Sequence, residues 1–150
     1  MSILAAILDL KSTLESDSAL DAFCQARFGK SITVKTSYRN REEISMGECP
    51  VVLMTRPRVT RENGLNRRAR GNHTVRLYFG FYQADTAGDP RDTANQTAIE
   101  FEEAIEDAVS ADTTRGGNAS STVPKDSVND EGILHPVYFG VMEIEITKRL

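Results

Sequence analysis

Residues that commonly bind metals or perform catalysis are scarce in this sequence. It holds two cysteines, Cys24 and Cys49, and two histidines, His73 and His135. Two isolated cysteines are too few for a zinc site, and a disulfide is unexpected in a cytosolic protein, so we expect both to be small buried residues. Neither histidine has a sequence neighbour that suggests a general-base partner, and both are expected at strand ends or on the surface.

Sequence motifs of enzymes are also missing. The chain has no G-x-S-x-G, no H-E-x-x-H and no glycine-rich phosphate loop ahead of a helix. The Gly116-Gly117 pair falls in a polar stretch rather than at a strand-to-helix turn. We therefore expect no enzyme activity, no catalytic residue, no metal site and no cofactor.

Long apolar runs are absent as well. No run approaches the roughly 20 residues that a membrane-spanning helix needs. The stretch from Met1 to Leu14 contains Asp9 and Lys11, and it lacks the basic leader and cleavage site of a signal peptide. We expect a protein that is made in the cytosol and does not enter a membrane.

What the sequence does contain is ordinary globular composition. Of its 150 residues, 39% are hydrophobic and 27% are charged. These proportions argue against general disorder, and the length suits one domain, residues 1–150, that buries a core without disulfides.

Local patterns predict two short helices, then strands, with one longer helix before the last strand. Asp17 or Ser18 marks the start of the second helix, and Gly29 marks its end. Asp89-Pro90 marks the start of the long helix. The apolar stripe of that helix is Ala94, Ala98, Phe101, Ile105 and Ala108. Strands are expected at Ile32–Tyr38, Cys49–Thr55, Thr74–Gln83 and Val137–Lys148.

These elements indicate an α+β fold. We expect an antiparallel sheet of about four strands, with one long helix on one face and two short N-terminal helices. Long loops are expected at about residues 56–72 and 111–132, because both stretches are polar and lack apolar periodicity.

Charge is strongly segregated along the chain. The segment from Arg56 to Arg76 holds seven arginines and a single acid, Glu62, so it carries +6. Since the net charge is -4, the remaining residues carry -10. Three interpretations of the arginine-rich loop follow: a protein interface, a nucleic-acid contact, or a merely solvated loop.

A protein interface between copies of the chain is favoured, since a basic arm on an acidic body is self-complementary in a head-to-tail arrangement. Against nucleic acid stand the sequence pI of about 5.2 and the lack of an aromatic residue within 56–72. The candidate subunit-interface residues are Arg56, Arg58, Arg61, Arg67, Arg68, Arg70, Glu100, Glu103, Glu106 and Asp107.

The order of elements carries a family resemblance. Paired helices run from Ile3 to Phe28, the strand Ile32–Thr36 follows, and Cys49–Met54 leads into the long loop. The return strand Val75–Phe79, the helix started by Asp-Pro and a final strand complete the chain. In this order the chain resembles the small tail terminator, or tail completion, proteins of long-tailed bacteriophages and related prophage minor tail proteins.

This resemblance implies a virion structural protein with the following partners. It would form a homo-oligomeric ring, usually of six copies, at the head-proximal end of the tail, after assembly in the host cytoplasm. The ring would stop growth of the tail tube protein and meet the head-side connector protein, while DNA passes through without specific binding. The alternatives are a head–tail connector, or neck, protein and, from a different class, a nucleic-acid-binding accessory protein that uses the arginine-rich loop.

Overall fold

A computed structural model gives the fold, and it describes residues 2–37, 43–61, 71–83, 90–133 and 136–148, without the side chains of residues 90–92. Its three α-helices are α1 (Ile3–Ser16), α2 (Ser18–Phe28) and α3 (Pro90–Ser110). Of the two predicted caps, Asp17 begins α2, and its side chain accepts a hydrogen bond from the Leu20 amide at 2.8 Å. Gly29 ends α2 in the left-handed conformation, with φ of 75°.

The sheet has five strands in the order β1-β2-β3-β5-β4. The β1–β2 pair is parallel and the other pairs are antiparallel. The α+β class is confirmed, whereas the strand number and the purely antiparallel arrangement were wrong. The chain crosses between β1 and β2 through a 3-10 turn, η2 (Met46–Glu48), instead of reversing in a hairpin. The strands are β1 (Thr33–Lys35), β2 (Val51–Arg61), β3 (Gly71–Tyr82), β4 (Ala119–Asn129) and β5 (Val137–Lys148).

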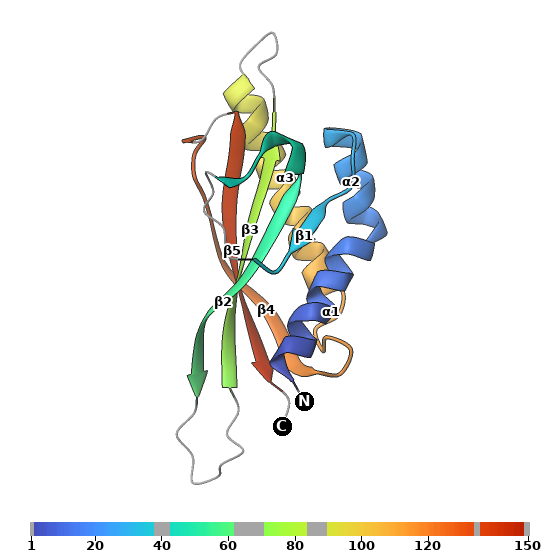
Figure 1. The fold of residues 1–150 in the computed structure, drawn as a ribbon, viewed down its shortest axis with the longest axis vertical. Helices are drawn as coiled ribbons and strands as arrows, with labels where there is room; N and C mark the ends of the chain where they lie inside the picture. Colours follow the sequence, from blue (N-terminus) through green and yellow to red (C-terminus); the bar gives the residue numbers. More distant parts are fainter. Residues whose placement is uncertain (1, 38–42, 62–70, 84–89, 134–135, 149–150) are drawn as a thin grey trace.

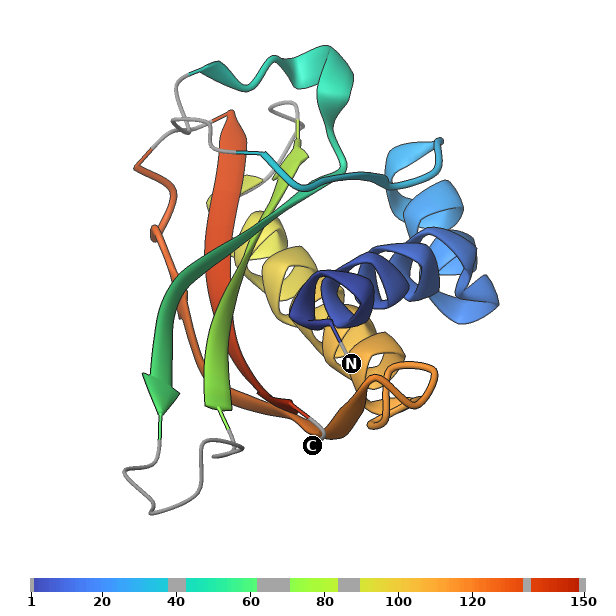
Figure 2. The same cartoon turned by 60° about the horizontal axis from the view of Figure 1, so that its bottom comes forward.

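All three helices lie on one face of the sheet (Figures 1 and 2). Phe101 of α3 is fully buried between the layers. Its ring lies 5.5–6.1 Å, centroid to centroid, from those of Phe23, Phe28, Phe79 and Phe81. The predicted position of the long helix on one face of the sheet is therefore confirmed, and an aromatic cluster joins α2, α3 and the sheet.

A second, smaller core lies on the opposite face of the sheet. Its buried residues are Ile44, Cys49, Val51, Leu53 and Phe139. The segment that contains η2 packs on this part of the sheet. The face of the sheet without helices therefore has a local apolar core under the crossover.

The stretch 111–132, predicted as a loop, contains the edge strand β4. It pairs with β5 along most of its length, with register shifts after Ala119 and Pro124. Only Ala119 and Thr122 of this strand are buried. Few apolar residues are therefore needed in it, and the sequence lacks the apolar alternation by which a strand is recognised. An edge strand tolerates proline and polar residues because one side of its backbone remains unpaired, and the hydrogen bonds to β5 hold it in place.

The loop predicted at 56–72 is also shorter than expected. β2 continues to Arg61 and β3 begins at Gly71, so only residues 62–70 connect them, and these lie outside the described residues. Pro57 falls at the register shift between Thr55 and Arg58, where no ladder hydrogen bond is required of it. The two strands pair antiparallel as a hairpin.

In the part of the chain that the structure describes, no helix is long and apolar enough to cross a membrane.

Candidate functional site

The β2–β3 hairpin carries exposed arginines away from the helix layer. Arg56, Arg58 and Arg61 have exposed side chains at the end of β2. Figure 1 shows the hairpin ends of β2 and β3 at the same end of the molecule as the start of α1. Among the described residues, neither Arg58 nor Arg61 forms an ion pair. We call residues 56–61 and 71–73 the basic hairpin; three further candidates lie outside the described residues, namely Arg67, Arg68 and Arg70.

His73 lies at the base of the basic hairpin and is buried, with 6% of its surface exposed. His73 is the third residue of β3, so the expected strand-end position is confirmed, whereas the alternative of a surface position was wrong because the side chain lies on the buried face of the strand. Its Nδ1 lies 3.3 Å from Arg56 Nη1. Burial first, and then the charges of Arg56, Lys148 and Arg61, lower the pKa of His73. Positive charge is thus concentrated around His73. The other histidine, His135, lies outside the described residues.

Arg76, further along β3, is engaged within its own chain. Its Nε donates to Glu143 Oε1 of β5 at 2.9 Å across the sheet face that lacks helices. The positive charge of Arg76 is therefore neutralised by Glu143, whereas the charges of Arg58 and Arg61 are not neutralised by a described residue.

The predicted acidic counterpart lies on α3. Glu103, Glu106 and Asp107 are exposed, and none of them pairs with a cation among the described residues. Glu100 differs, because it forms an ion pair with Arg27 of α2. Within the described residues the structure brings none of these acids into an ion pair with the basic hairpin. The described hairpin arginines and α3 acids therefore do not pair within one copy, and a contact between two copies would bring them together.

Sequence reasoning missed a cavity of about 340 Å³ between the first half of α3 and the adjoining end of the sheet. Aromatic side chains of β3 and β5 form part of its wall, among them Phe79, Phe81 and Tyr138. Its polar lining comprises Asn95, Glu102, Asn129, Asp130 and Glu131. These residues come from α3 and from the β4–β5 turn, so no local pattern could group them.

Asp130 is fixed within this cavity. It is 8% exposed, and its Oδ1 accepts hydrogen bonds from the backbone amides of Gly132 at 3.0 Å and Phe139 at 3.5 Å. These bonds shape the turn between β4 and β5 around a carboxylate, so the negative charge is held at the cavity wall.

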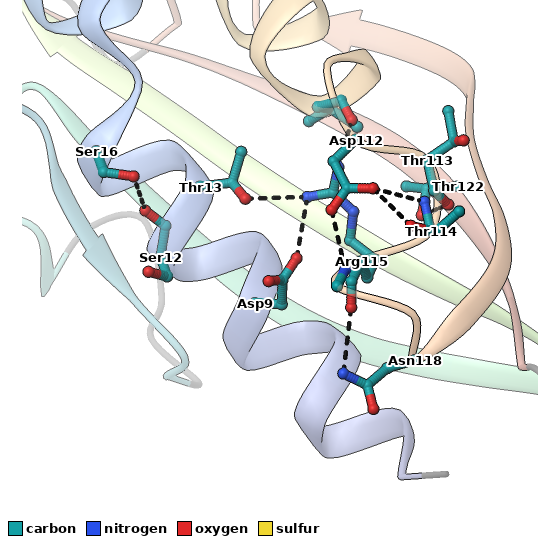
Figure 3. Close-up of polar contacts among 12 residues, drawn as sticks. Asp9, Ser12, Thr13, Ser16, Asp112, Thr113, Thr114, Arg115, Asn118 and Thr122 are labelled. Atoms are coloured by element: carbon teal, nitrogen blue, oxygen red, sulfur yellow. Dashed lines mark hydrogen bonds and ion pairs between the residues drawn. The ribbon is translucent and has the colours of Figure 1, made fainter.

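A buried arginine, Arg115, fastens the turn after α3 to α1 (Figure 3). Its side chain is fully buried, and burial lowers its pKa. Nη2 donates to the Val109 carbonyl at 2.8 Å, and Nη1 donates to Thr13 Oγ1 at 3.3 Å. Asp9 Oδ2 lies 3.8 Å from Nη1 and supplies the opposite charge.

The same turn is organised by Asp112. Its carboxylate accepts from the Gly116 and Thr114 amides at 2.9 Å each and from the Thr114 hydroxyl at 2.8 Å (Figure 3). The bond from Gly116 is the main cause that lowers the pKa of Asp112 to about 2. Because these groups bond to one another and to neighbouring backbone, we interpret the cluster as structural.

Cys24 and Cys49 are buried and unbonded to each other, as expected. Burial raises the pKa of Cys24 to about 12 and that of Cys49 to about 11. Both thiols therefore stay protonated and unreactive at neutral pH. Across the described ranges, no group of three or more histidine, cysteine or acidic residues is arranged to hold a metal ion.

No protein-family profile and no curated protein sequence matches this chain.

Proposed function

We propose that this protein is a virion structural protein, the tail terminator that caps a phage tail tube as a ring and joins it to the head-side connector. The observation that carries the proposal is the projecting basic hairpin, whose exposed Arg58 and Arg61 lack ion-pair partners among the described residues. The order of its helices and strands resembles the order in the tail terminators, and this resemblance supports the same assignment.

The charge distribution suits a heterologous contact between neighbours. Each copy offers one basic hairpin and one acidic α3 face, so a head-to-tail arrangement uses both surfaces on every subunit and forms a ring when the rotation between neighbours closes. An exposed ion pair contributes only about 0–1 kcal/mol, so the contact needs several pairs together. Its strength should fall with added salt, because salt screens exposed charges.

Electron microscopy combined with native mass measurement tests the proposal. The protein is imaged over a concentration series, alone and with tail tube protein, because the tube end can be the trigger for assembly. A closed six-fold ring is expected. A ring of twelve copies would instead assign the protein to the head–tail connectors, and isolated copies under every condition would refute the ring.

A nucleic-acid-binding accessory protein is the second candidate, since the same exposed arginines could neutralise phosphates. Titration with duplex and single-stranded DNA at two salt concentrations separates the two. Under the terminator proposal, ring formation depends on the hairpin arginines, and DNA affinity stays weak and does not depend on sequence.

A further inference from the structure

The cavity beneath α3 has the size and lining of a binding site. Its volume of about 340 Å³ falls within the roughly 300–1,000 Å³ of ligand cavities in proteins. Phe81 and Tyr138 stack with ring centroids 5.4 Å apart and contribute apolar surface. Glu102, Asp130 and Glu131 add three carboxylates, and no lysine or arginine is among the described residues that line it.

Aromatic walls combined with carboxylates suit a cation that also has an apolar, planar face. A guanidinium group fits this description, because it stacks on aromatic rings, donates in a planar fork to carboxylates and is weakly hydrated. A divalent metal ion fits poorly, since it prefers a shell of oxygen ligands to ring surfaces. The cavity chemistry therefore indicates an arginine side chain.

The basic hairpin of the same chain is too far away to supply that side chain. His73 at its base and Phe81 at the cavity are both on β3, and a strand rises about 3.3 Å per residue, so they lie roughly 25 Å apart. Figure 1 shows the hairpin and the start of α3 at opposite ends of the sheet. The arginines of the basic hairpin therefore cannot enter the cavity of their own chain, whereas those of a neighbouring copy can.

We propose that the cavity receives one arginine, from among Arg56, Arg58 and Arg61, of a neighbouring copy. This inference rests on the proposed function, because it requires copies that associate head to tail. It adds a specific anchor to the exposed charge pairs: an aromatic-lined cavity at one end of each subunit holds the hairpin of the next. Complementary charge and the placement of the two surfaces at opposite ends of the sheet support this source.

The chemistry of the cavity can be tested on the monomer by NMR titration. N-acetyl-arginine amide should shift the backbone amide signals of Gly132 and Gly140, whereas the uncharged citrulline analogue should not. Replacing Glu102→Gln and Glu131→Gln together should weaken binding about tenfold. The matched control is Glu15→Gln with Asp126→Asn, two exposed acids outside both the cavity lining and the acidic α3 face, which should leave binding unchanged. Equal shifts with citrulline, or no shift with arginine, would overturn the proposal.

The source of the arginine can be tested by crosslinking the full-length protein. A variant with Arg58→Cys and Glu131→Cys should give a covalent ladder under mild oxidation, and the native thiols do not compete because both are buried. Suppose that rings form, that this variant yields no ladder, and that Arg58→Cys with Glu103→Cys does. That result would overturn the cavity contact and leave the ring intact. If the wild-type protein never assembles, both the ring and this source of arginine are wrong.

Discussion

At the residue scale, two glycines make room for aromatic rings between the paired strands β3 and β5. Gly80 lies opposite Phe139, and Gly140 lies opposite Phe79. A Cβ atom at either glycine would lie 2.4 Å from the ring of its partner, which is too close. Phe79 covers Gly140 on the face that holds the main core, and Phe139 covers Gly80 on the face that holds the smaller core.

We predict that Gly140→Ala destabilises the protein by about 1–3 kcal/mol, because Phe79 is packed against Phe101 and cannot move away without strain. Denaturant unfolding measures the change. Gly47→Ala is the matched control, since its Cβ would meet only Ser45 Oγ at 3.9 Å and should cost little. Equal effects of the two substitutions would contradict the packing argument.

Arg115 provides a second prediction at this scale. Arg115→Ala removes the donors to Val109 and Thr13 and leaves a void beside α1, so we expect a loss of about 2–4 kcal/mol. Arg115→Met fills most of the same volume without a buried charge and should cost less than half as much. Thermal and denaturant unfolding of both variants decide this; equal losses would show that charge, rather than volume, stabilises the turn.

At the element scale, the basic hairpin should be sensitive to acid. An arginine only donates, so the Arg56 contact requires an unprotonated Nδ1 on His73. Burial and the nearby cations lower the pKa of His73 below 6.5, so unfolding takes up a proton at acid pH. This contribution to stability is complete above pH 6.5 and is lost as the pH falls below that value.

The prediction is tested with His73→Asn, which keeps an acceptor near the Nδ1 position but does not titrate. The wild-type protein should lose more unfolding free energy than the variant between pH 7.5 and pH 5. Hydrogen exchange of β2 and β3 amides would locate the loss at the hairpin. Identical pH profiles would show that Arg56 and His73 are not coupled.

At the scale of the whole molecule, the charge pattern yields a prediction about assembly. Reversal of Arg67, Arg68 and Arg70 to Glu should leave the monomer folded, since these residues lie beyond the strands, and should impair ring formation. Reversal of Glu103, Glu106 and Asp107 to Lys in the same chain should partly restore it. Circular dichroism checks the fold and native mass measurement checks assembly; normal assembly of the triple arginine variant would show that these three arginines are not needed for the contact.

The sequence by itself determined the elements whose causes are local. Asp17 and Gly29 bound α2 through hydrogen bonds and a backbone conformation that involve near neighbours. The α3 stripe predicted the buried Phe101 and Ile105, because helical periodicity depends on the sequence alone. The exposed arginines at the end of β2 were predicted for a similar reason, since the one acid nearby, Glu62, leaves most of them without local partners.

Only the tertiary structure decided the features that depend on distant partners. β4 is a strand because β5 supplies its hydrogen bonds, although its own residues are polar. Arg115 is buried because Asp9 and Thr13, on a helix far away in sequence, receive its guanidinium. The cavity likewise exists because α3 and the β4–β5 turn meet over the sheet. In each case the contact joins segments whose separation along the chain hides it from any local pattern, and folding alone brings them together.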